Sequence, residues 1–286
     1  MDIVRHATAD AWFLQVAPLL KAQEVEFGLV WSIANHYLGQ PEPRALFYTV
    51  EIDGRVAAFA IRTQGQKLLF PFDLPEVVEA LVERTLSDIP DLSGINAPER
   101  TAARFRDHWC QATAQVETNS VVNILYAATE LVPPRATPGT ARPASPKDRD
   151  DISAWAHQFV VETHLDATGE ELAEAFRTHL HNQNLLVWDT HNRPVSMAIL
   201  RKQSPRTSRV SFVFTPPEHR GQGYGSQVTA AATEQALGAG DTHVTLFAEG
   251  DNPQSNRIYQ RLGYGEVGRY AELTFSPDAS AARRRS

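Results

Sequence analysis

The stretch VSFVFTPPEHRGQGYGS, residues 210–226, limits most strongly what this chain can fold into. An apolar run typical of a buried strand ends at two prolines, and an arginine then opens a loop with glycines at positions 221, 223 and 225. Glycine tolerates positive φ and exposes its backbone amide, so several N–H groups of such a loop can converge on an anion. The run that follows, SQVTAAATEQALGAG, predicts a helix whose positive dipole end points at the same place. The stretch therefore predicts a strand, a phosphate-binding loop and a helix.

Two common phosphate-binding loops do not match this one. The P-loop of nucleotide triphosphatases needs a lysine after its last glycine, and none follows here, which argues against ATP hydrolysis. A dinucleotide-binding loop reads G-x-G-x-x-G directly after a strand, whereas these glycines are spaced one residue closer and TPPEHR precedes them. Asp241 lies about where a ribose-binding acid would fall, but a single acid in a polar turn gives a nucleotide enzyme weak support.

Two motifs together resemble the GNAT acetyltransferases. RGQGYG resembles the family's R/Q-x-x-G-x-G/A signature, and the apolar run before it resembles the family's fourth strand. DNPQSNRIYQRLGY, residues 251–264, resembles the family's N-x-x-[AS]-x-x-x-Y-x-x-x-G-[FY] helix. The resemblance covers about residues 148–275. The two motifs at the expected separation are much more specific than either motif alone. It implies an α/β fold, acetyl-CoA as cosubstrate and transfer of an acetyl group to an amine.

The order of the expected elements predicts two related halves. VPPRATPGTARPASPKD, residues 132–148, holds five prolines and predicts an extended linker. A strand, a polar turn and a second strand are expected on both sides of it, at 45–63 and 184–202, with Asp53 and Gly54 as the hairpin turn of the first. We therefore predict an α/β fold with two tandem GNAT-like domains, each a mixed, mostly antiparallel sheet flanked by helices. Their ranges are 1–132 and 148–286, joined by a Pro-rich linker at 133–147; the alternative is two unrelated α/β modules with similar connections.

The two halves differ at the phosphate-binding loop. In the first half, KLLFPFDLPEVVEALVERTL passes from strand to helix without a glycine. Asp73 and Glu76 stand where amide groups would meet an anion, and their negative charges would repel a phosphate. We therefore expect the first domain to be a degenerate copy, and the chain to bind one acetyl-CoA.

The resemblance also implies which residues contact the cofactor. The backbone of Val213, Phe214 and Thr215 is expected to pair with the pantetheine arm as an added strand would, beside a bulge that leaves an amide free. The pyrophosphate is expected in a loop made of Arg220, Gly221, Gln222, Gly223, Tyr224, Gly225 and Ser226. On the second motif, the expected contacts are Asn252, Ser255 and Asn256, although Asn252 before a proline is also a natural helix N-cap.

Tyr259 is the predicted general acid. A tyrosine with a reference pKa of ~10 can protonate a departing thiolate whose reference pKa is ~8.5. Core packing is the alternative, since Ile258, Tyr259 and Leu262 are spaced like one apolar face. The general base is less well defined, because the strand before the loop offers no carboxylate. Glu249 and Glu162 are the candidate bases, and each has the alternative of being an exposed surface acid.

Composition argues against several other functions. The formal charge of −7 and the isoelectric point near 5.8 argue against a nucleic-acid surface, and no apolar run approaches the ~18 residues of a membrane span. The N-terminus has no apolar stretch typical of a secretory signal, and Cys110 is the single cysteine, so a cytoplasmic protein is expected. His179 and His181 have no accompanying ligands, so no metal site is predicted. The expected partner is a small-molecule or peptide amine; the rival function is a non-catalytic acyl-CoA-binding protein.

Overall fold

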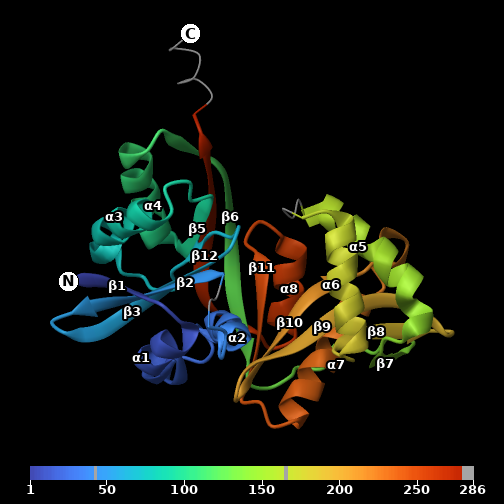
Figure 1. Cartoon of the computed structure of the whole chain (residues 1–286). Helices are drawn as coiled ribbons and strands as arrows, with labels where there is room; N and C mark the ends of the chain where they lie inside the picture. Colours follow the sequence, from blue (N-terminus) through green and yellow to red (C-terminus); the bar gives the residue numbers. More distant parts are fainter. Residues whose placement is uncertain (42–43, 164–166, 279–286) are drawn as a thin grey trace. The chain divides into compact units, whose positions relative to one another are not determined.

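The computed structural model describes residues 1–41, 44–163 and 167–278 (Figure 1). The chain forms two compact units. The first unit contains Met1–Leu125, Ala248–Pro253 and the segment that begins at Glu266, and the second contains Tyr126–Phe247 and Gln254–Gly265. Each unit is a mixed, mostly antiparallel sheet with flanking helices, which confirms the predicted fold class.

The sheet of the first unit has the spatial order β1, β2, β3, β4, β5, β12, β6. β4 and β5 are parallel, whereas β1–β2, β2–β3, β3–β4 and β5–β12 are antiparallel. The β2–β3 hairpin turns at Asp53 and Gly54, which both have positive φ, as the sequence predicted. The strand bounds are β1 (Asp2–His6), β2 (Ala45–Ile52), β3 (Arg55–Thr63), β4 (Leu68–Leu69), β5 (Gly94–Pro98), β6 (Gln115–Ala128) and β12 (Gly265–Pro277).

Helices cover both faces of this sheet. Neighbouring residues of β2 enter different cores: Phe47 packs with the helices α1 and α2, whereas Tyr48 packs with α3 and α4. Because both faces are buried, the strand is an almost continuous apolar run. The helix bounds are α1 (Ala9–Ala22), α2 (Gly28–Tyr37), α3 (Val78–Asp88) and α4 (Glu99–Ala112), with a short 3-10 helix η1 (Pro75–Val77) before α3.

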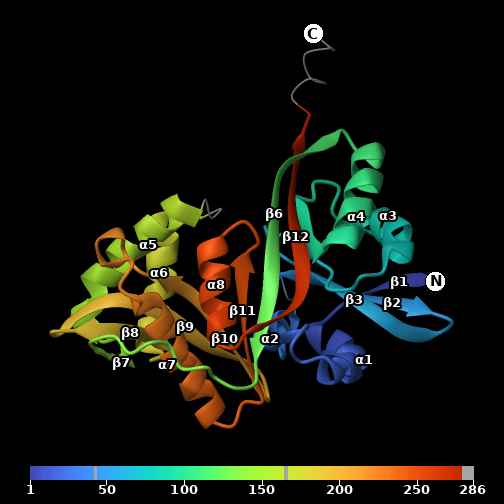
Figure 2. The same cartoon turned by 180° about the vertical axis from the view of Figure 1, so that it is seen from behind.

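The last strand of the chain lies in the first unit. β12 pairs antiparallel with β5 and runs beside β6 (Figures 1 and 2). Its alternate residues Ala271, Leu273 and Phe275 enter the core that α3 and α4 cover. The predicted domain ranges placed this segment with the second domain. The alternation of apolar residues reveals a strand, but it does not reveal which sheet will accept that strand.

The sheet of the second unit has the spatial order β11, β10, β9, β8, β7. β10 and β11 are parallel and the other pairs are antiparallel, so each unit contains one parallel pair after an antiparallel hairpin. The β8–β9 hairpin turns at His191 and Asn192, which both have positive φ. The strand bounds are β7 (Thr140–Pro143), β8 (Leu185–Thr190), β9 (Arg193–Ser204), β10 (Thr207–Phe214) and β11 (His243–Glu249).

The helices of the second unit pack on this sheet. α5 and α6 lie side by side and cover the face that carries Met197 and Ile199 (Figure 1), whereas α7 packs against β8, β9 and β10. The segment predicted as a linker, 133–147, contains β7, which pairs with β8 and so forms part of the sheet. The helix bounds are α5 (Arg149–Thr163), α6 (Gly169–His181), α7 (Tyr224–Gly238) and α8 (Pro253–Arg261), with 3-10 helices η2 (Pro146–Asp148) and η3 (Pro217–His219).

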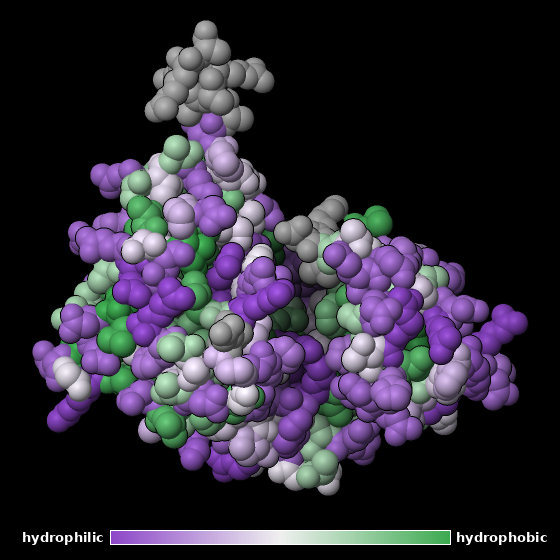
Figure 3. All heavy atoms as spheres, viewed as in Figure 1, coloured by the Kyte–Doolittle hydropathy of each residue, from purple (hydrophilic) through white to green (hydrophobic). Residues whose placement is uncertain are grey.

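Exposed hydrophobic residues are scattered over the surface. In Figure 3, hydrophobic residues form small groups separated by hydrophilic ones. Among the described residues, no helix is both long and apolar enough to cross a membrane. The exposed large hydrophobic side chains are Met1, Leu14, Val116, Val132, Val161 and Val267.

Candidate cofactor-binding and active site

Strand β10 contains a bulge near its end. Its register with β9 shifts between Ser211 and Phe214, and Phe212 between them has a φ of 50°. This confirms the bulge that the sequence predicted. Within the described strands, β10 is in register with β11 only over Thr207–Arg209, although β10 continues to Phe214. Beyond those positions the two strands part, which leaves room beside β10 for an extended ligand arm.

The three glycines of the loop have different structural roles. Gly221 and Gly223 have positive φ values of 76° and 85°, and Gly223 is the N-cap of α7. Gly225 already lies in the first turn of α7, where an added Cβ would be 3.2 Å from Thr215 Oγ1. The helix therefore begins at Tyr224, earlier than the predicted start at Ser226, and Gly225 serves close packing rather than an unusual backbone conformation.

A cavity of about 330 Å³ lies between this loop and α8. Its loop side includes Arg220, all three glycines and Ser226. Its other side is one face of α8, because the lining positions repeat at the spacing of a helical face. These are Gln254, Arg257, Ile258 and Arg261. Three arginines thus border a cavity whose other wall is glycine backbone and the N-terminus of a helix, an arrangement suited to a phosphate group.

The α8 face was missed in the sequence. Ser255 and Asn256 were the expected cofactor contacts, and they lie on α8 beside the lining face; Asn256 is buried. The missed signal was the spacing of Gln254, Arg257 and Arg261, which place polar and basic side chains on one face. Glu249 and Asn252 belong to the segment Ala248–Pro253 of the first unit. The structure therefore brings the loop together with α8, and the roles of Glu249 and Asn252 stay predictions.

The proline-rich segment before β7 also borders the loop. Residues 133–138 line a second cavity, of about 560 Å³, together with Gly221, Gln222 and Gly223. Thr137 Oγ1 donates a hydrogen bond to Gln222 O at 3.4 Å, and Gln227 Nε2 donates to Arg135 O at 2.8 Å. This segment therefore supports the loop from outside, a role that its composition did not reveal.

Comparison with known proteins identifies the fold. Residues 149–264 match the Acetyltransferase (GNAT) family. This part of the chain belongs to the GNAT family. No significant match was found among curated protein sequences. Membership points to an acyltransferase that uses an acyl-CoA donor.

Solved structures share the fold over nearly the whole chain. A GCN5-related N-acetyltransferase from Sphaerobacter thermophilus has a TM-score of 0.62 at 16% identity, covering 96% of this chain and 95% of that one. A GNAT-family acetyltransferase from Colwellia psychrerythraea has a TM-score of 0.60 at 13% identity, with 96% and 100% covered. A tandem GNAT protein from the clavulanic acid biosynthesis pathway has a TM-score of 0.56 at 12% identity, with 96% and 97% covered. At these identities the likeness concerns the fold.

Arg220 connects the GNAT loop to β10 and α5. Its Nε donates to Thr215 O at 2.9 Å, and its Nη2 lies 2.5 Å from Glu162 Oε2. Its guanidinium also lies 5.8 Å from the centroid of the Phe214 ring. Glu162, a candidate base, is thus the ion-pair partner of the loop arginine. The ion pair engages Oε2 of Glu162, so a role of this carboxylate as the base stays a prediction.

Tyr259 is buried in the second unit. Its side chain faces the rings of Tyr126 and Tyr264, with centroids 6.4 and 6.2 Å away. Burial raises the pKa of Tyr259 to about 12, so its phenol is protonated at neutral pH and holds a proton that it can donate. Tyr259 is not among the residues that line the cavity, and its burial is what a packing role requires, so its role as general acid stays a prediction.

Other predicted site residues hold the loop in place. Tyr224 Oη donates to Gln222 Oε1 at 3.0 Å, and the Thr215 and Ser196 hydroxyl oxygens lie 2.9 Å apart.

The histidine at the end of α6 has a polar partner within the protein: His179 Nδ1 lies 2.9 Å from Asn184 Oδ1. In the described part of the chain, no group of three His, Cys, Asp or Glu side chains is placed to hold a metal ion.

Proposed function

We propose that the second unit transfers an acetyl group from acetyl-CoA to a primary amine of a small molecule or peptide. The single observation that supports this most is that one cavity joins the positive-φ glycines before α7 to the arginine-bearing face of α8. The single cysteine, Cys110, is a free thiol, which fits a reducing compartment such as the cytoplasm.

The residues around the cavity fit an acyl-CoA. The exposed amides of Gly221 and Gly223 and the positive charges of Arg220, Arg257 and Arg261 suit a pyrophosphate. The parted strand β10 offers the backbone of Val213 and its neighbours to an extended arm. When bound, acetyl-CoA supplies a thioester whose acetyl group is activated for attack by an amine.

Tyr259 would hold the proton that the departing thiolate requires. Its raised pKa keeps Oη protonated before the reaction, and the positioned donor lowers the barrier to departure. The amine must also lose a proton. Glu249 and Glu162 remain the candidate bases, and Glu162 is also the ion-pair partner of Arg220.

Calorimetry and a thioester assay test this function together. We expect acetyl-CoA and CoA to bind more tightly than ATP or NAD, and thioester cleavage to depend on an added primary amine from a broad panel. Tighter binding of ATP or NAD would overturn the proposal. Tight acetyl-CoA binding without turnover of any amine would instead indicate a non-catalytic acyl-CoA-binding protein.

A further inference from the structure

Buried polar groups without partners lie along one face of β10. Among the described residues, Thr207 Oγ1, Arg209 Nε and Ser211 Oγ are buried without a hydrogen-bond partner, and so is Arg201 Nε on β9. Positions 207, 209 and 211 alternate along the strand, so their side chains point to the same face. Arg201 lies directly opposite Arg209 in the β9–β10 register. Two arginines therefore lie opposite one another, each with a buried Nε that no described residue accepts a hydrogen bond from.

This face is the one that α5 and α6 cover. Ser211 lies opposite Ile199, and Ile199 packs in the core formed with those helices. Arg209 is the last position at which β10 is in register with β11, and the bulge begins at Ser211. The line of polar groups therefore leads to the place where the two strands part, beside the bulge.

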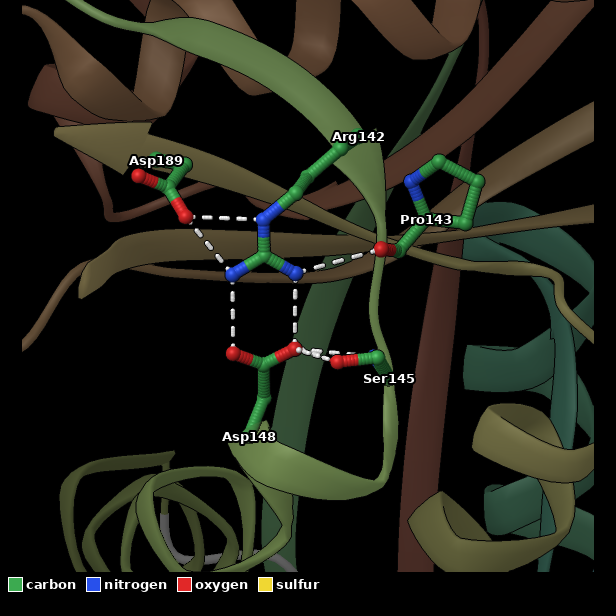
Figure 4. Close-up of polar contacts among 5 residues, drawn as sticks. All are labelled: Arg142, Pro143, Ser145, Asp148 and Asp189. Atoms are coloured by element: carbon green, nitrogen blue, oxygen red, sulfur yellow. Dashed lines mark hydrogen bonds and ion pairs between the residues drawn. The ribbon is translucent and has the colours of Figure 1, made fainter. Parts of the chain in front are cut away.

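Arg142 shows how the same unit neutralises a partly buried arginine. Its Nη1 and Nη2 donate to the two oxygens of Asp148 at 2.7 and 2.8 Å, and its Nε donates to Asp189 Oδ2 at 2.7 Å (Figure 4). Hydrogen bonds to Asp148 and Asp189 raise the pKa of Arg142 although burial opposes them. Where the fold needs a cation at such a position, it supplies carboxylates.

Arg201 and Arg209 have the opposite environment. Burial lowers the pKa of Arg201, and burial together with the charge of Arg201 lowers the pKa of Arg209 to about 9. His179, at the end of α6, does not supply a counter-ion for these arginines. Burial and the charge of Arg201 lower the pKa of His179, and its hydrogen bond to Asn184 acts in the opposite direction. Both arginines are only partly buried, but the buried Nε of each has no hydrogen-bond partner, and an uncompensated charge in such a place destabilises a fold. A bound anion would remove that cost.

We propose that Arg201 and Arg209 bind an anionic group, a carboxylate or a phosphate, of the acceptor whose amine is acetylated at the bulge of β10. This inference rests on the proposed function. Paired guanidinium groups match the oxygens of either anion, and the Ser211 and Thr207 hydroxyls can add hydrogen bonds. Arg209 and Val213 are separated by about 13 Å along the strand at ~3.3 Å per residue. The acceptor would thus carry its amine and its anion at the two ends of a chain, not on neighbouring atoms.

Thermal unfolding tests anion binding without requiring turnover. The protein is saturated with CoA so that the glycine loop is occupied, and inorganic phosphate is compared with chloride at equal ionic strength. Phosphate should raise the melting temperature of the wild type, and Arg201→Gln and Arg209→Gln should each abolish that rise. Both variants should also be more stable than the wild type without phosphate, because a partly buried charge without a carboxylate partner has been removed. Arg193→Gln, at an exposed position of β9, is the matched control and should keep the response.

Matched acceptors then distinguish the two anions. Each ω-amino acid is compared with the alkylamine of the same length, and each aminoalkyl phosphate with its amino alcohol. The wild type should prefer the anionic member of one series by at least about tenfold in kcat/KM, as expected for charge-assisted hydrogen bonds. Arg201→Gln and Arg209→Gln should lose this preference while rates with the neutral member stay within a few fold.

The outcomes separate this inference from the proposed function. If CoA itself does not bind, the proposed function fails. If CoA binds but phosphate stabilises the wild type and both glutamine variants equally, or none of them, the arginine pair is not an anion site. Equal use of both members of every acceptor pair by the wild type would overturn the inference in the same way.

Discussion

The two units differ most at the connection from the first strand of the parallel pair to the following helix. In the second unit this connection, from β10 to α7, ends in glycines with positive φ and faces an open cavity lined by α8. In the first unit the connection from β4 to α3 carries Asp73. Its Oδ2 accepts a hydrogen bond from Arg100 Nη1 at 3.0 Å and its Oδ1 accepts one from Thr101 Oγ1 at 3.3 Å, both at the start of α4. In the first unit, the carboxylate of Asp73 thus binds the start of the next helix. In the second unit, the corresponding place beside the loop is open to the anion of a ligand.

The backbone of this connection differs between the two units. Of the residues between β4 and α3, all of which the structure describes, none has positive φ. The connection therefore cannot turn several amides toward one point as Gly221 and Gly223 allow. The two units thus keep a similar order of strands and helices but differ in the backbone of this loop, which is the reason for expecting a single cofactor site.

The largest effect is expected at Tyr259 of α8, the predicted general acid. The helix α4 of the first unit contains no tyrosine. Tyr259→Phe keeps the ring and its packing, so turnover should fall by ~10²–10⁴ while acetyl-CoA affinity stays within a few fold. Because the pKa is raised to about 12, ionisation of this phenol should cause no loss of activity at neutral or mildly alkaline pH. Steady-state kinetics and calorimetry measure both quantities. Near-normal turnover with a lower melting temperature would instead make Tyr259 a packing residue.

A smaller effect is expected from Gly223→Ala. Alanine disfavours the φ of 85°, and its Cβ would lie 3.2 Å from Thr137 Oγ1, so the loop should relax away from the shape that exposes its amides. Binding would have to restore that strained shape, which costs roughly 1–2 kcal/mol and lowers CoA affinity by about tenfold. Gly240→Ala is the control, because Gly240 has a φ of 97° with nothing within 4 Å of an added Cβ. Equal CoA affinity in the two variants would show that the loop around Gly223 does not contribute to CoA binding.

The difference between the units also predicts the stoichiometry. We expect calorimetry to give one acetyl-CoA per chain, bound in the second unit, and Gly223→Ala to weaken that single isotherm. Two equivalent cofactors per chain would show that the first unit is not a degenerate copy.

The smallest effect is expected at Asp73. Asp73→Ala removes a carboxylate from an exposed ion pair with Arg100, so the free energy of unfolding should change by about 0–1 kcal/mol. The stoichiometry should remain at one, because removing the carboxylate does not supply the missing glycines. A second CoA bound by this variant would mean that Asp73 alone had kept the first unit closed.

Features that depend on neighbouring residues were predictable from the sequence. The Asp53–Gly54 turn, the loop containing Gly221 and Gly223, and the bulge near Val213 were all expected, and the structure contains them. Each depends on local backbone preferences or on a motif within a short stretch. The order of elements in the two halves was predictable for the same reason, because apolar periodicity is a local pattern.

Which segments meet was decided only by the tertiary structure. The alternating apolar residues of β12 indicate a strand, yet only the free edge of β5 decides that this strand lies in the first unit. Arg201 and Arg209 belong to one polar hairpin in the sequence, but the register of β9 with β10 sets them opposite one another on a buried face. Likewise, Glu162 became the partner of Arg220 because α5 packs near the loop. Local sequence specifies backbone shape and periodicity, whereas register, edge pairing and burial depend on contacts between residues far apart in the chain.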